Sequence, residues 1–426
     1  MGDVTPDQEP AQQPVQKPAL RTVAEHQQAI LDALRPLPPY DQPLLDALGL
    51  VAAEDVVAPI ALPSFDNSAM DGYAVQAADL AGATQENPIT LPVVGEIAAG
   101  RSEPIVVTPG TCVRIMTGAP MPRGADSVVP VEWTDAGAAT VRITQTPALG
   151  ASVRRAGEDL QAGDKVMDAD TVLGPRQIAV LAGVGRARVS ARPRPRVVVV
   201  STGAELREPG TRLGEGQIYD SNSYTLAAAA RQAGAVVYRV GIVDDDPKKI
   251  MDTLSDQLVR ADLVITSGGV SKGVYDVVKE VLTKLGTIDF PEVAMQPGKP
   301  QGFGVMGDDE VPIFTLPGNP VSAYVSFEVF VRPALRKLMG AIPYRRQPVQ
   351  GVVMDGFSSP PGRRQFVRAA ATSGEEGWMA STVGGHGSHL LGGLSRSNAL
   401  IVVPEDVTAV RAGDQAELWL LDEETG

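Results

Sequence analysis

The second half of the chain repeats one pattern, in which an apolar run ends at a small or acidic turn and a helical pattern follows. The runs with their turns are VVVVSTG (197–203), VVYRVGIVDDDP (236–247), LVITSGGVSKG (263–273) and VPIFTLPGNP (311–320). Helices are expected over about 221–233, 247–260, 276–285 and 321–338. The alternation predicts a parallel sheet with right-handed crossovers. Ligands of such sheets bind at the carboxyl ends of the strands, so the turns predict one site.

The N-terminal part has a different pattern of apolar and polar residues. Residues 1–18 are rich in Pro and Gln, which predicts a disordered tail. Thr22 and Glu25 can form the capping box of a helix that RPLPP (35–39) ends, and a second short helix is expected over 43–49.

From Ala58 to about Arg192, short apolar runs are broken by Gly and Pro, which predicts β structure with many turns. A helix expected at 175–183 is interpreted as a partner of the N-terminal helices, so the β-rich part is an insertion. After PYRRQP (343–348), short alternating strands predict a small β-barrel or sandwich.

The predicted fold class is therefore a multidomain α/β protein, with a three-layer α/β sheet domain, an inserted β-rich module, a helical or hinge domain and a C-terminal β-barrel. The expected divisions are a disordered tail at 1–18, a helical or hinge subdomain at 19–57 plus 164–194, a β-rich subdomain at 58–163, an α/β subdomain at 195–342 and a barrel subdomain at 343–426.

Composition narrows the function classes. The 426 residues include 37 basic and 51 acidic side chains, and the net charge of −14 disfavours nucleic acid and anionic membrane surfaces as partners. The apolar runs are far shorter than the roughly 18 residues that span a bilayer, and the N-terminus has no apolar signal core. We expect a soluble, cytoplasmic protein without direct membrane insertion. One cysteine and three histidines leave oxygen ligands as the expected metal chemistry.

The run TSGGVSKG (266–273) is the first candidate site. Small residues after a strand leave backbone N–H groups open to an anion. Glycine-rich turns also occur for packing alone, and the run lacks the spacing of a P-loop or a dinucleotide fold. The candidate ligand-binding residues here are Ser267, Gly268, Gly269, Ser271 and Lys272.

Acidic residues accompany this run. Asp244–Asp246 end one predicted strand, Asp276 opens a predicted helix, and Glu205 lies in the STGAEL turn. Two carboxylates about 4 Å apart repel by roughly 4 kcal/mol at an effective dielectric near 20, so convergent aspartates require solvent, protonation or a cation. Mg²⁺ fits, because it takes one or two carboxylates and completes its shell with water and phosphate. The alternative is that these aspartates are helix N-caps.

The remaining candidates are turns. PGKP (297–300) and PGNP (317–320) are rigid because proline fixes φ. Lys299 can present an ammonium group to phosphate, although a simple surface lysine is the alternative. SFDNSAMDGYAV (64–75) and the run 114–132 carry further polar residues in predicted turns.

Together these motifs resemble the MoeA/gephyrin E-domain family, the molybdopterin molybdenumtransferases. The motifs, in order from about residue 20 to 420, are FDNSAMDGYAV, RIMTGAPMPRGADSVVPVE, RRAGEDL, STGAEL with GQIYDSN, TSGGVSKGVYD, PGKP, LPGNPVSA and GSH.

The resemblance implies a molybdopterin-binding α/β domain and an activity. Molybdate and adenylylated molybdopterin are the substrates, Mg²⁺ is the cofactor, and molybdenum cofactor and AMP are the products. Family members are elongated homodimers whose cleft lies between the sheet domain of one protomer and the inserted module of the other. A molybdopterin adenylyltransferase and apo-molybdoenzymes are the implied partners.

The resemblance also assigns residues. The catalytic set would be Asp71, Thr117, Asp159, Glu205 and Asp276, and the metal ligands would be Asp245 and Asp276. The substrate-binding residues would be those of the TSGGVSKG run together with Lys299, Pro317, Pro320, Arg363 and Ser388.

Some positions depart from the family pattern. Gln296 and Glu292 stand where basic residues are frequent, Ala204 replaces an aspartate, and Val274 replaces a glutamate beside an added Lys272. Gephyrin-type proteins use the same dimer to bind short peptide segments of other proteins, so a peptide-binding scaffold is a second hypothesis. A general phosphate-ester or nucleotide-binding α/β protein is a third, which the inserted module disfavours.

Overall fold

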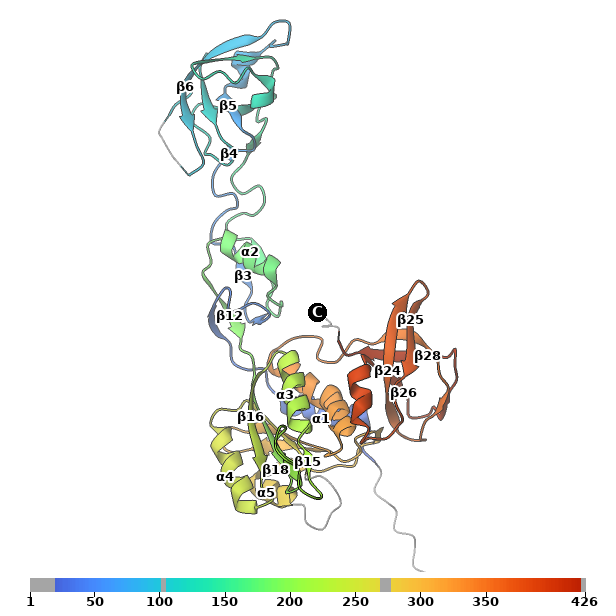
Figure 1. Ribbon diagram of the computed structural model, residues 1–426. Helices are drawn as coiled ribbons and strands as arrows, with labels where there is room; N and C mark the ends of the chain where they lie inside the picture. Colours follow the sequence, from blue (N-terminus) through green and yellow to red (C-terminus); the bar gives the residue numbers. More distant parts are fainter. Residues whose placement is uncertain (1–19, 101–104, 269–276, 423–426) are drawn as a thin grey trace, which may run out of the picture. The chain divides into compact units, whose positions relative to one another are not determined.

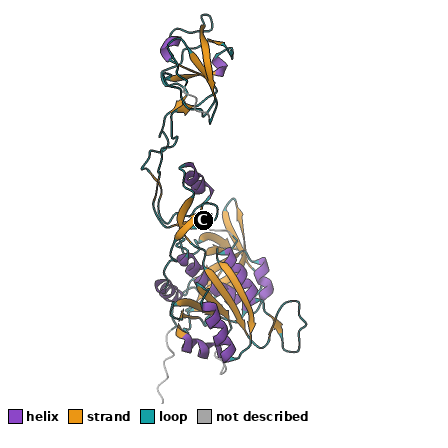
Figure 2. Ribbon diagram, turned by 90° about the vertical axis from the view of Figure 1, so that its left-hand side faces the viewer, coloured by secondary structure: helices purple, strands orange, loops and turns teal. Residues whose placement is uncertain are grey.

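The computed structural model describes residues 20–100, 105–268 and 277–422. These fall into two contact units, one made of residues 20–38 and 192–422 and the other of residues 39–191. Each is described by itself (Figures 1 and 2). Among the described residues, no helix combines the length and apolar character needed to cross a membrane.

A mixed sheet forms the centre of the first unit. In spatial order its described strands are β16 (Val236–Val243), β13 (Arg196–Thr202), β17 (Leu263–Ser267), β21 (Val311–Leu316), β20 (Gly302–Met306) and β18 (Gly286–Asp289). The first strands in this order, as far as β21, are parallel as predicted, whereas β20 runs antiparallel to both of its neighbours, β21 and β18. The sequence prediction of a parallel sheet is therefore wrong for β20.

Helices cover both faces of this sheet, and Figure 1 labels most of them. One face carries α1 (Val23–Ala33), α3 (Asn222–Gln232), α6 (Pro320–Ser326), the π-helical segment η3 (Phe327–Val331) and α7 (Arg332–Leu338). The other face carries α4 (Pro247–Leu258) and α5 (Val277–Leu285). The valines of β13 alternate between these two cores, as the period of a strand with two covered faces requires.

The N-terminal helix packs differently from the prediction. Its capping box of Thr22 and Glu25 is present, as expected. Val23 and Ile30 are, however, part of the core of the sheet domain, whereas α2 (Pro175–Gly183) belongs to the other unit. The expected pairing of these two helices is therefore wrong, because the apolar face of α1 is buried against the helices after β21.

The C-terminal part is a closed barrel. Its strands follow the ring β24 (Arg364–Gly374), β25 (Gly377–Thr382), β22 (Val349–Val353), β28 (Gln415–Leu420) and β26 (Ala399–Val403), and β26 pairs with β24. Short elements beside it are β19 (Met295–Gln296) on β24, β23 (Phe357–Ser358) with β27 (Ala409–Val410), and η4 (Leu391–Arg396). Phe366, Leu400 and Val402 extend into the core of the sheet domain, so barrel and sheet domain pack together.

The second unit contains a twisted β sheet and a smaller helical part. The sheet order is β8 (Ser127–Pro130), β5 (Gly72–Val75), β7 (Cys112–Ile115), β6 (Ile89–Ile97) and β9 (Thr140–Ile143), with η1 (Ala77–Leu80), η2 (Val131–Trp133) and the pair β4 (Asn67–Ser68) and β10 (Val153–Arg154). The smaller part holds α2 with β1 (Tyr40–Pro43), β12 (Arg188–Arg192), β2 (Val51–Ala52), β3 (Val56–Val57) and β11 (Lys165–Met167).

The short helix expected over 43–49 does not form. Tyr40–Pro43 pairs with β12, and the following residues make turns with one helical bond, from Ala47 N to Pro43 O (3.0 Å). Gly49 has φ +78° and ends the segment. A stretch of this length does not repay the cost of helix nucleation, so strand pairing at its start decides its structure.

Candidate active site

The turns after β13, β17 and β21 meet at the carboxyl edge of the sheet. The strands end in register, with Ser201 opposite Ser267 and Ser267 opposite Leu316. A Cβ on Gly268 would lie 3.1 Å from the carbonyl oxygen of Thr202, and one on Gly318 would lie 3.9 Å from the Cα of Gly268. These turns are therefore in van der Waals contact, which confirms the convergence predicted from the sequence.

Gly268 has a specific structural role at this edge. Its φ of +98° lies in the left-handed region, and its backbone N donates to Leu316 O (3.1 Å), which links the ends of β17 and β21. The close carbonyl of Thr202 leaves no comfortable space for a side chain. Glycine suits both demands.

Asn222 ties these turns to a helix. Its Nδ2 donates to Ser267 Oγ (2.8 Å) and to Gly318 O (2.7 Å), and Ser267 is buried. Asn222 is the first residue of α3, and Ser221 before it makes no side-chain cap bond. Sequence reasoning thus missed Asn222 as a residue of the site, because an Asn at a helix start is most simply explained as a cap.

The acidic residues after β16 have three different environments. Asp246 accepts from Lys248 N (2.8 Å) and caps α4, so the cap interpretation is correct for it. Asp244 pairs with Lys249 (2.5 Å), whose ammonium lowers the pKa of that carboxyl. Asp245 is exposed, and its Oδ2 accepts from Ala204 N (3.1 Å), which joins the turns after β16 and β13.

Glu205 lies at the same edge. It is exposed, while its carboxylate folds back so that Oε2 would be 2.7 Å from a Cβ on Gly203. The backbone of Glu205 accepts from Ile218 N (3.0 Å) at the start of the ribbon formed by β14 (Leu206–Arg207) and β15 (Ile218–Tyr219). Glu205 and Asp245 are therefore carboxylates of one edge, presented by neighbouring turns.

The donor set suits a hard divalent cation. Mg²⁺ in proteins commonly has one or two carboxylate ligands, with water and substrate phosphate in the other positions. Asp245 is exposed, and the structure shows a contact of its Oδ2 with Ala204 N and none of its Oδ1 with a described residue. Within residues 20–100, 105–268 and 277–422, no group of three or more His, Cys, Asp or Glu side chains forms a complete metal cage. The exposed carboxylate of Asp245 could provide one ligand of a cation whose other positions are filled by water and substrate.

Lys299 lies at the same edge and is paired. Its Nζ is 2.7 Å from Glu292 Oε2, and both side chains are about one-third exposed. The turn that carries Lys299 is fixed by a bond from Gln301 Nε2 to Ser326 Oγ (2.7 Å). Lys299 is thus held by a specific partner, and its role in binding phosphate stays a prediction.

The loop with Ser388 reaches the PGNP turn. Asn319 Nδ2 donates to Ser388 Oγ (3.0 Å), and Val321 N donates to Ser388 O (3.0 Å). Pro320 is the first residue of α6, where its missing N–H costs nothing, and Pro317 is buried. The structure thus brings Ser388, Pro317 and Pro320 together.

Arg368 supports this loop and was missed by sequence reasoning. Its buried guanidinium donates to the carbonyl oxygens of Leu390 and Gly385, and burial lowers its pKa. Arg363 is half-buried in the turn before β24. An arginine in a barrel strand carries no distinctive sequence pattern, so Arg368 could not be separated from the other arginines.

The candidates of the second unit form a pair and a separate turn. Asp71 Oδ1 accepts from Thr117 N (2.7 Å) and from Thr117 Oγ1 (2.8 Å). These bonds, first that of the backbone N–H, lower the pKa of the exposed Asp71 carboxyl. Asp159 is exposed on another turn, where its N donates to Leu62 O (3.1 Å).

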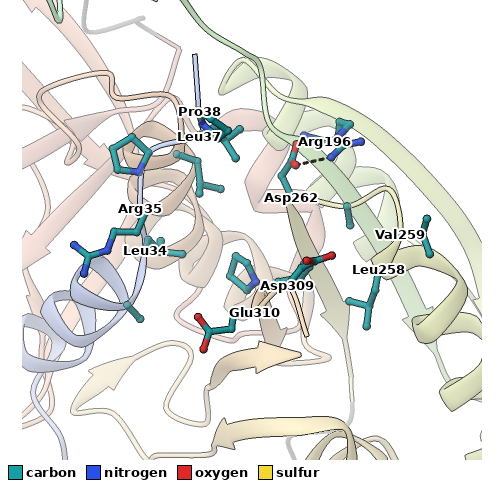
Figure 3. A pocket seen from close by; sticks show the side chains of 16 residues that line it. Leu34, Arg35, Leu37, Pro38, Arg196, Leu258, Val259, Asp262, Asp309 and Glu310 are labelled. Atoms are coloured by element: carbon teal, nitrogen blue, oxygen red, sulfur yellow. Dashed lines mark hydrogen bonds and ion pairs between the residues drawn. The ribbon is translucent and has the colours of Figure 1, made fainter. Parts of the chain in front are cut away.

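Four predicted site residues, Gly269, Ser271, Lys272 and Asp276, lie outside the described residues. A cavity of about 400 Å³ lies elsewhere (Figure 3). It is lined by the ion pair of Arg196 and Asp262, which are at or before the first residues of β13 and β17. It is therefore at the amino edge of the sheet and does not belong to the candidate site.

Comparison with known proteins identifies the family. Residues 21–185 match the MoeA N-terminal region (domain I and II), 198–337 a probable molybdopterin binding domain, and 350–421 the MoeA C-terminal region (domain IV). Molybdopterin molybdenumtransferase 2 of Mycobacterium tuberculosis (strain ATCC 25618 / H37Rv) is 47% identical over 409 residues, which are 94% of this chain and 99% of the relative. The chain belongs to the molybdopterin molybdenumtransferase (MoeA) family.

More distant members agree. Molybdopterin molybdenumtransferase of Bacillus subtilis (strain 168) is 34% identical over 389 residues, 90% of each chain. The solved molybdopterin biosynthesis MoeA protein of Pyrococcus horikoshii has a TM-score of 0.81 at 29% identity and covers 95% of this chain and 100% of its own. The predicted fold class and family are thus confirmed, and the protein is a transferase of molybdenum cofactor biosynthesis.

Proposed function

We propose that the protein inserts molybdenum from molybdate into the dithiolene of adenylylated molybdopterin, with Mg²⁺-dependent release of AMP. The observation that carries this proposal is the convergence of Asp245, Glu205 and the glycine turn of Gly268 at one sheet edge. Carboxylates that can hold a cation, next to a glycine turn that leaves room for a phosphate group, suit cleavage of a phosphoanhydride. The MoeA family provides the substrate class.

The chain's own residues have distinct roles in this proposal. The Ser267 hydroxyl donates to the phosphate end of the substrate, Gly268 leaves room for that group beside the turn, and Asn222 keeps the turn in place. Lys299 and Ser388 offer an ammonium and a hydroxyl to an oxyanion, which suits molybdate better than thiolates do. Asp245 would hold Mg²⁺, together with Asp276 from outside the described residues. The cation would neutralise the charge that develops on the phosphate oxygens.

The proposal includes a homodimer with shared sites. Asp71, Thr117 and Asp159 of residues 58–163 would complete the site of a second protomer, and a molybdopterin adenylyltransferase and apo-molybdoenzymes would deliver substrate and accept product. The subdomain limits proposed for this arrangement are those of the sequence analysis, except that α1 packs with the sheet domain. No observation on the described residues favours the peptide-binding scaffold, and we do not propose it.

Asp245→Asn tests the catalytic assignment. We expect the variant to fold as the parent does and to lose Mg²⁺-dependent AMP release by about 100-fold, because one metal ligand is removed. Asp252→Asn is the matched control, since Asp252 is exposed on α4 and the change in charge is the same. Purified protein, adenylylated molybdopterin, molybdate and Mg²⁺ are combined and AMP is quantified. Equal release by both variants would contradict the role of Asp245.

Subunit mixing tests the shared site. Asp71→Asn and Asp245→Asn proteins, each inactive alone, are unfolded together and refolded. If each site takes Asp71 from one protomer and Asp245 from the other, hybrid dimers regain one intact site, and about a quarter of the parent activity returns. If both residues come from the same protomer, no activity returns. Refolded parent protein is the control for losses during refolding.

A further inference from the structure

Glu292 and Lys299 are placed at the ligand edge by strand order. β20 begins with Gly302, which is opposite Thr315 near the carboxyl end of β21, and β18 ends with Asp289 opposite Phe303. The PGKP turn before β20 and the turn after β18 are therefore both at the carboxyl edge of the parallel strands. This is the edge that carries Asp245 and Gly268.

The backbone around this pair is fixed without the two side chains. Val293 N donates to Lys299 O (2.8 Å), Glu292 forms a bridge with Pro300, and Arg21 N donates to Glu292 O (3.0 Å). The Glu292 carboxylate is thus not needed to hold its own segment. Its contact with Lys299 Nζ, 2.7 Å, is an addition to an existing turn structure.

The Glu292 carboxylate contacts the Lys299 ammonium in the way that an oxyanion ligand would. Carboxylate, molybdate and phosphate monoesters are all oxyanions that accept charge-assisted hydrogen bonds from an ammonium group. Lys299 is about one-third exposed, so a ligand at the edge can reach it. Any oxyanion that binds there must displace Glu292 or share the ammonium with it, and it also meets the negative charge of Glu292.

We infer that Glu292 is an internal counter-ion that competes with the oxyanion substrate for Lys299 and so weakens oxyanion binding at this edge. This inference rests on the proposed function for the identity of the ligand. Glu292 is a specificity-determining residue here, since it holds the ammonium in position when no ligand is bound and must release it when an oxyanion arrives. The oxyanion is molybdate or the phosphate group of the nucleotide, which share this chemistry.

The first experiment measures binding without turnover. Sodium molybdate and, separately, AMP are titrated into the full-length protein by calorimetry at constant ionic strength. For Glu292→Gln we expect the dissociation constant of one of the two probes to fall about fivefold, since an exposed ion pair contributes up to about 1 kcal/mol. The probe whose affinity changes identifies the ligand of Lys299.

Two further variants define the cause. Glu292→Gln combined with Lys299→Gln should lose the gained affinity, because the released ammonium is what binds the oxyanion. Glu280→Gln is the control for charge, because Glu280 is an exposed ion-paired carboxylate on α5. Unchanged or weaker binding in Glu292→Gln, or equally tight binding in the double variant, would overturn the inference.

A kinetic measurement separates this role from a structural one. In AMP release, Glu292→Gln should lower the KM of the affected substrate about fivefold and leave kcat within about twofold. A structural role predicts a lower melting temperature and a lower kcat instead. If Glu292→Gln does not fold, Glu292→Asp replaces it. Its shorter carboxylate cannot keep the 2.7 Å contact, so unchanged binding in that variant would overturn the inference too.

The outcomes also separate this inference from the proposed function. If the parent protein releases no AMP but Glu292→Gln binds the oxyanion more tightly, the transferase proposal is contradicted and the counter-ion inference is supported. Normal AMP release by the parent, with no change in binding or KM in Glu292→Gln, would support the transferase proposal and overturn the counter-ion inference.

Discussion

The carboxylate of Asp71 accepts two hydrogen bonds from Thr117, one from its backbone N–H at 2.7 Å and one from its hydroxyl at 2.8 Å. The two residues lie on different segments of the inserted module, beside β5 and β7, which pair with each other. This arrangement keeps an exposed carboxyl ionised and orients one of its oxygens, so that the other is free for a substrate or a cation.

Thr117→Val should change Asp71 without unfolding the module. The variant keeps the shape and the backbone bond but loses the hydroxyl donor, so the pKa of Asp71 should rise toward its ordinary value. We expect AMP release to fall about tenfold, in line with the loss of one hydrogen bond to a charged group. NMR titration of the Asp71 carboxyl and steady-state kinetics measure the two effects. Thr117→Ser keeps the hydroxyl and should keep both properties.

Asn222→Ala should loosen the edge where the turns meet. The substitution removes the donors to Ser267 Oγ and Gly318 O, and the buried Ser267 hydroxyl loses a partner. We expect a loss of about 1–2 kcal/mol in the free energy of unfolding and a larger relative fall in kcat/KM. Urea unfolding and AMP release are compared with Gln232→Ala, an exposed position on the same helix. Equal effects of the two variants would contradict the positioning role of Asn222.

Comparison of Gly268→Ala with Gly210→Ala separates the cost of a side chain at positive φ from the cost of its contact with Thr202. Both glycines have φ near +90°, but a Cβ on Gly210 meets nothing within 4 Å, whereas one on Gly268 meets Thr202 O at 3.1 Å. We expect a loss of about 1 kcal/mol for Gly210→Ala and about 2–3 kcal/mol for Gly268→Ala, measured by urea unfolding. Only Gly268→Ala should also impair AMP release. A similar cost at both positions would mean that the Thr202 contact is unimportant.

His26 makes stability depend on pH. It is 2% exposed, its ring is edge-on to Phe330, and burial, followed by the charge of Arg21, lowers its pKa to about 4. Between pH 6.5 and 4 the unfolded chain binds a proton that the folded chain does not. Stability from this residue is therefore complete above pH 6.5 and decreases as the pH falls, by roughly 3 kcal/mol in total.

His26→Gln tests this pH dependence, because glutamine stays neutral throughout the range. The free energy of unfolding in urea is measured at pH 7 and pH 4.5, and the parent should lose more stability than His26→Gln on acidification. His389→Gln, at an exposed position, should behave as the parent does. A parallel loss in His26→Gln would show that other groups cause the acid sensitivity.

The sequence predicted most of the sheet domain because its strong patterns survive in the fold. Val197–Val200 is too apolar to be anything but a strand covered on both faces, and Asp246 with Pro247 marks a helix start. β18 and β20 were missed, because GTID and GFGVM are short and rich in small residues, and only the pairing of β20 with β21 and of β18 with β20 fixes them as strands. Local pattern carries no information about such pairing.

In the candidate site, too, local motifs could be predicted from the sequence and long-range contacts could not. Motifs located Asp71, Thr117, Asp245 and Ser388, since chemistry and turn residues coincide in them. Pairings between distant residues could not be predicted, such as Asn319 with Ser388 or Asp245 with the backbone of Ala204. Glu292 appeared in the sequence only as an acid where a base is frequent, and the structure assigned it a partner, Lys299.

The chain leaves the larger unit before residue 39 and returns to it after residue 191, and the residues at these two junctions are in contact. Arg192 Nη1 donates to Leu37 O (3.0 Å), one residue before the chain departs at Pro38. A short turn could therefore close the larger unit with every one of its described strand pairings intact. In evolutionary terms, residues 39–191 are a single insertion in the larger unit. A change in its length would break no described strand pairing of the unit that carries Asp245, Gly268 and Lys299.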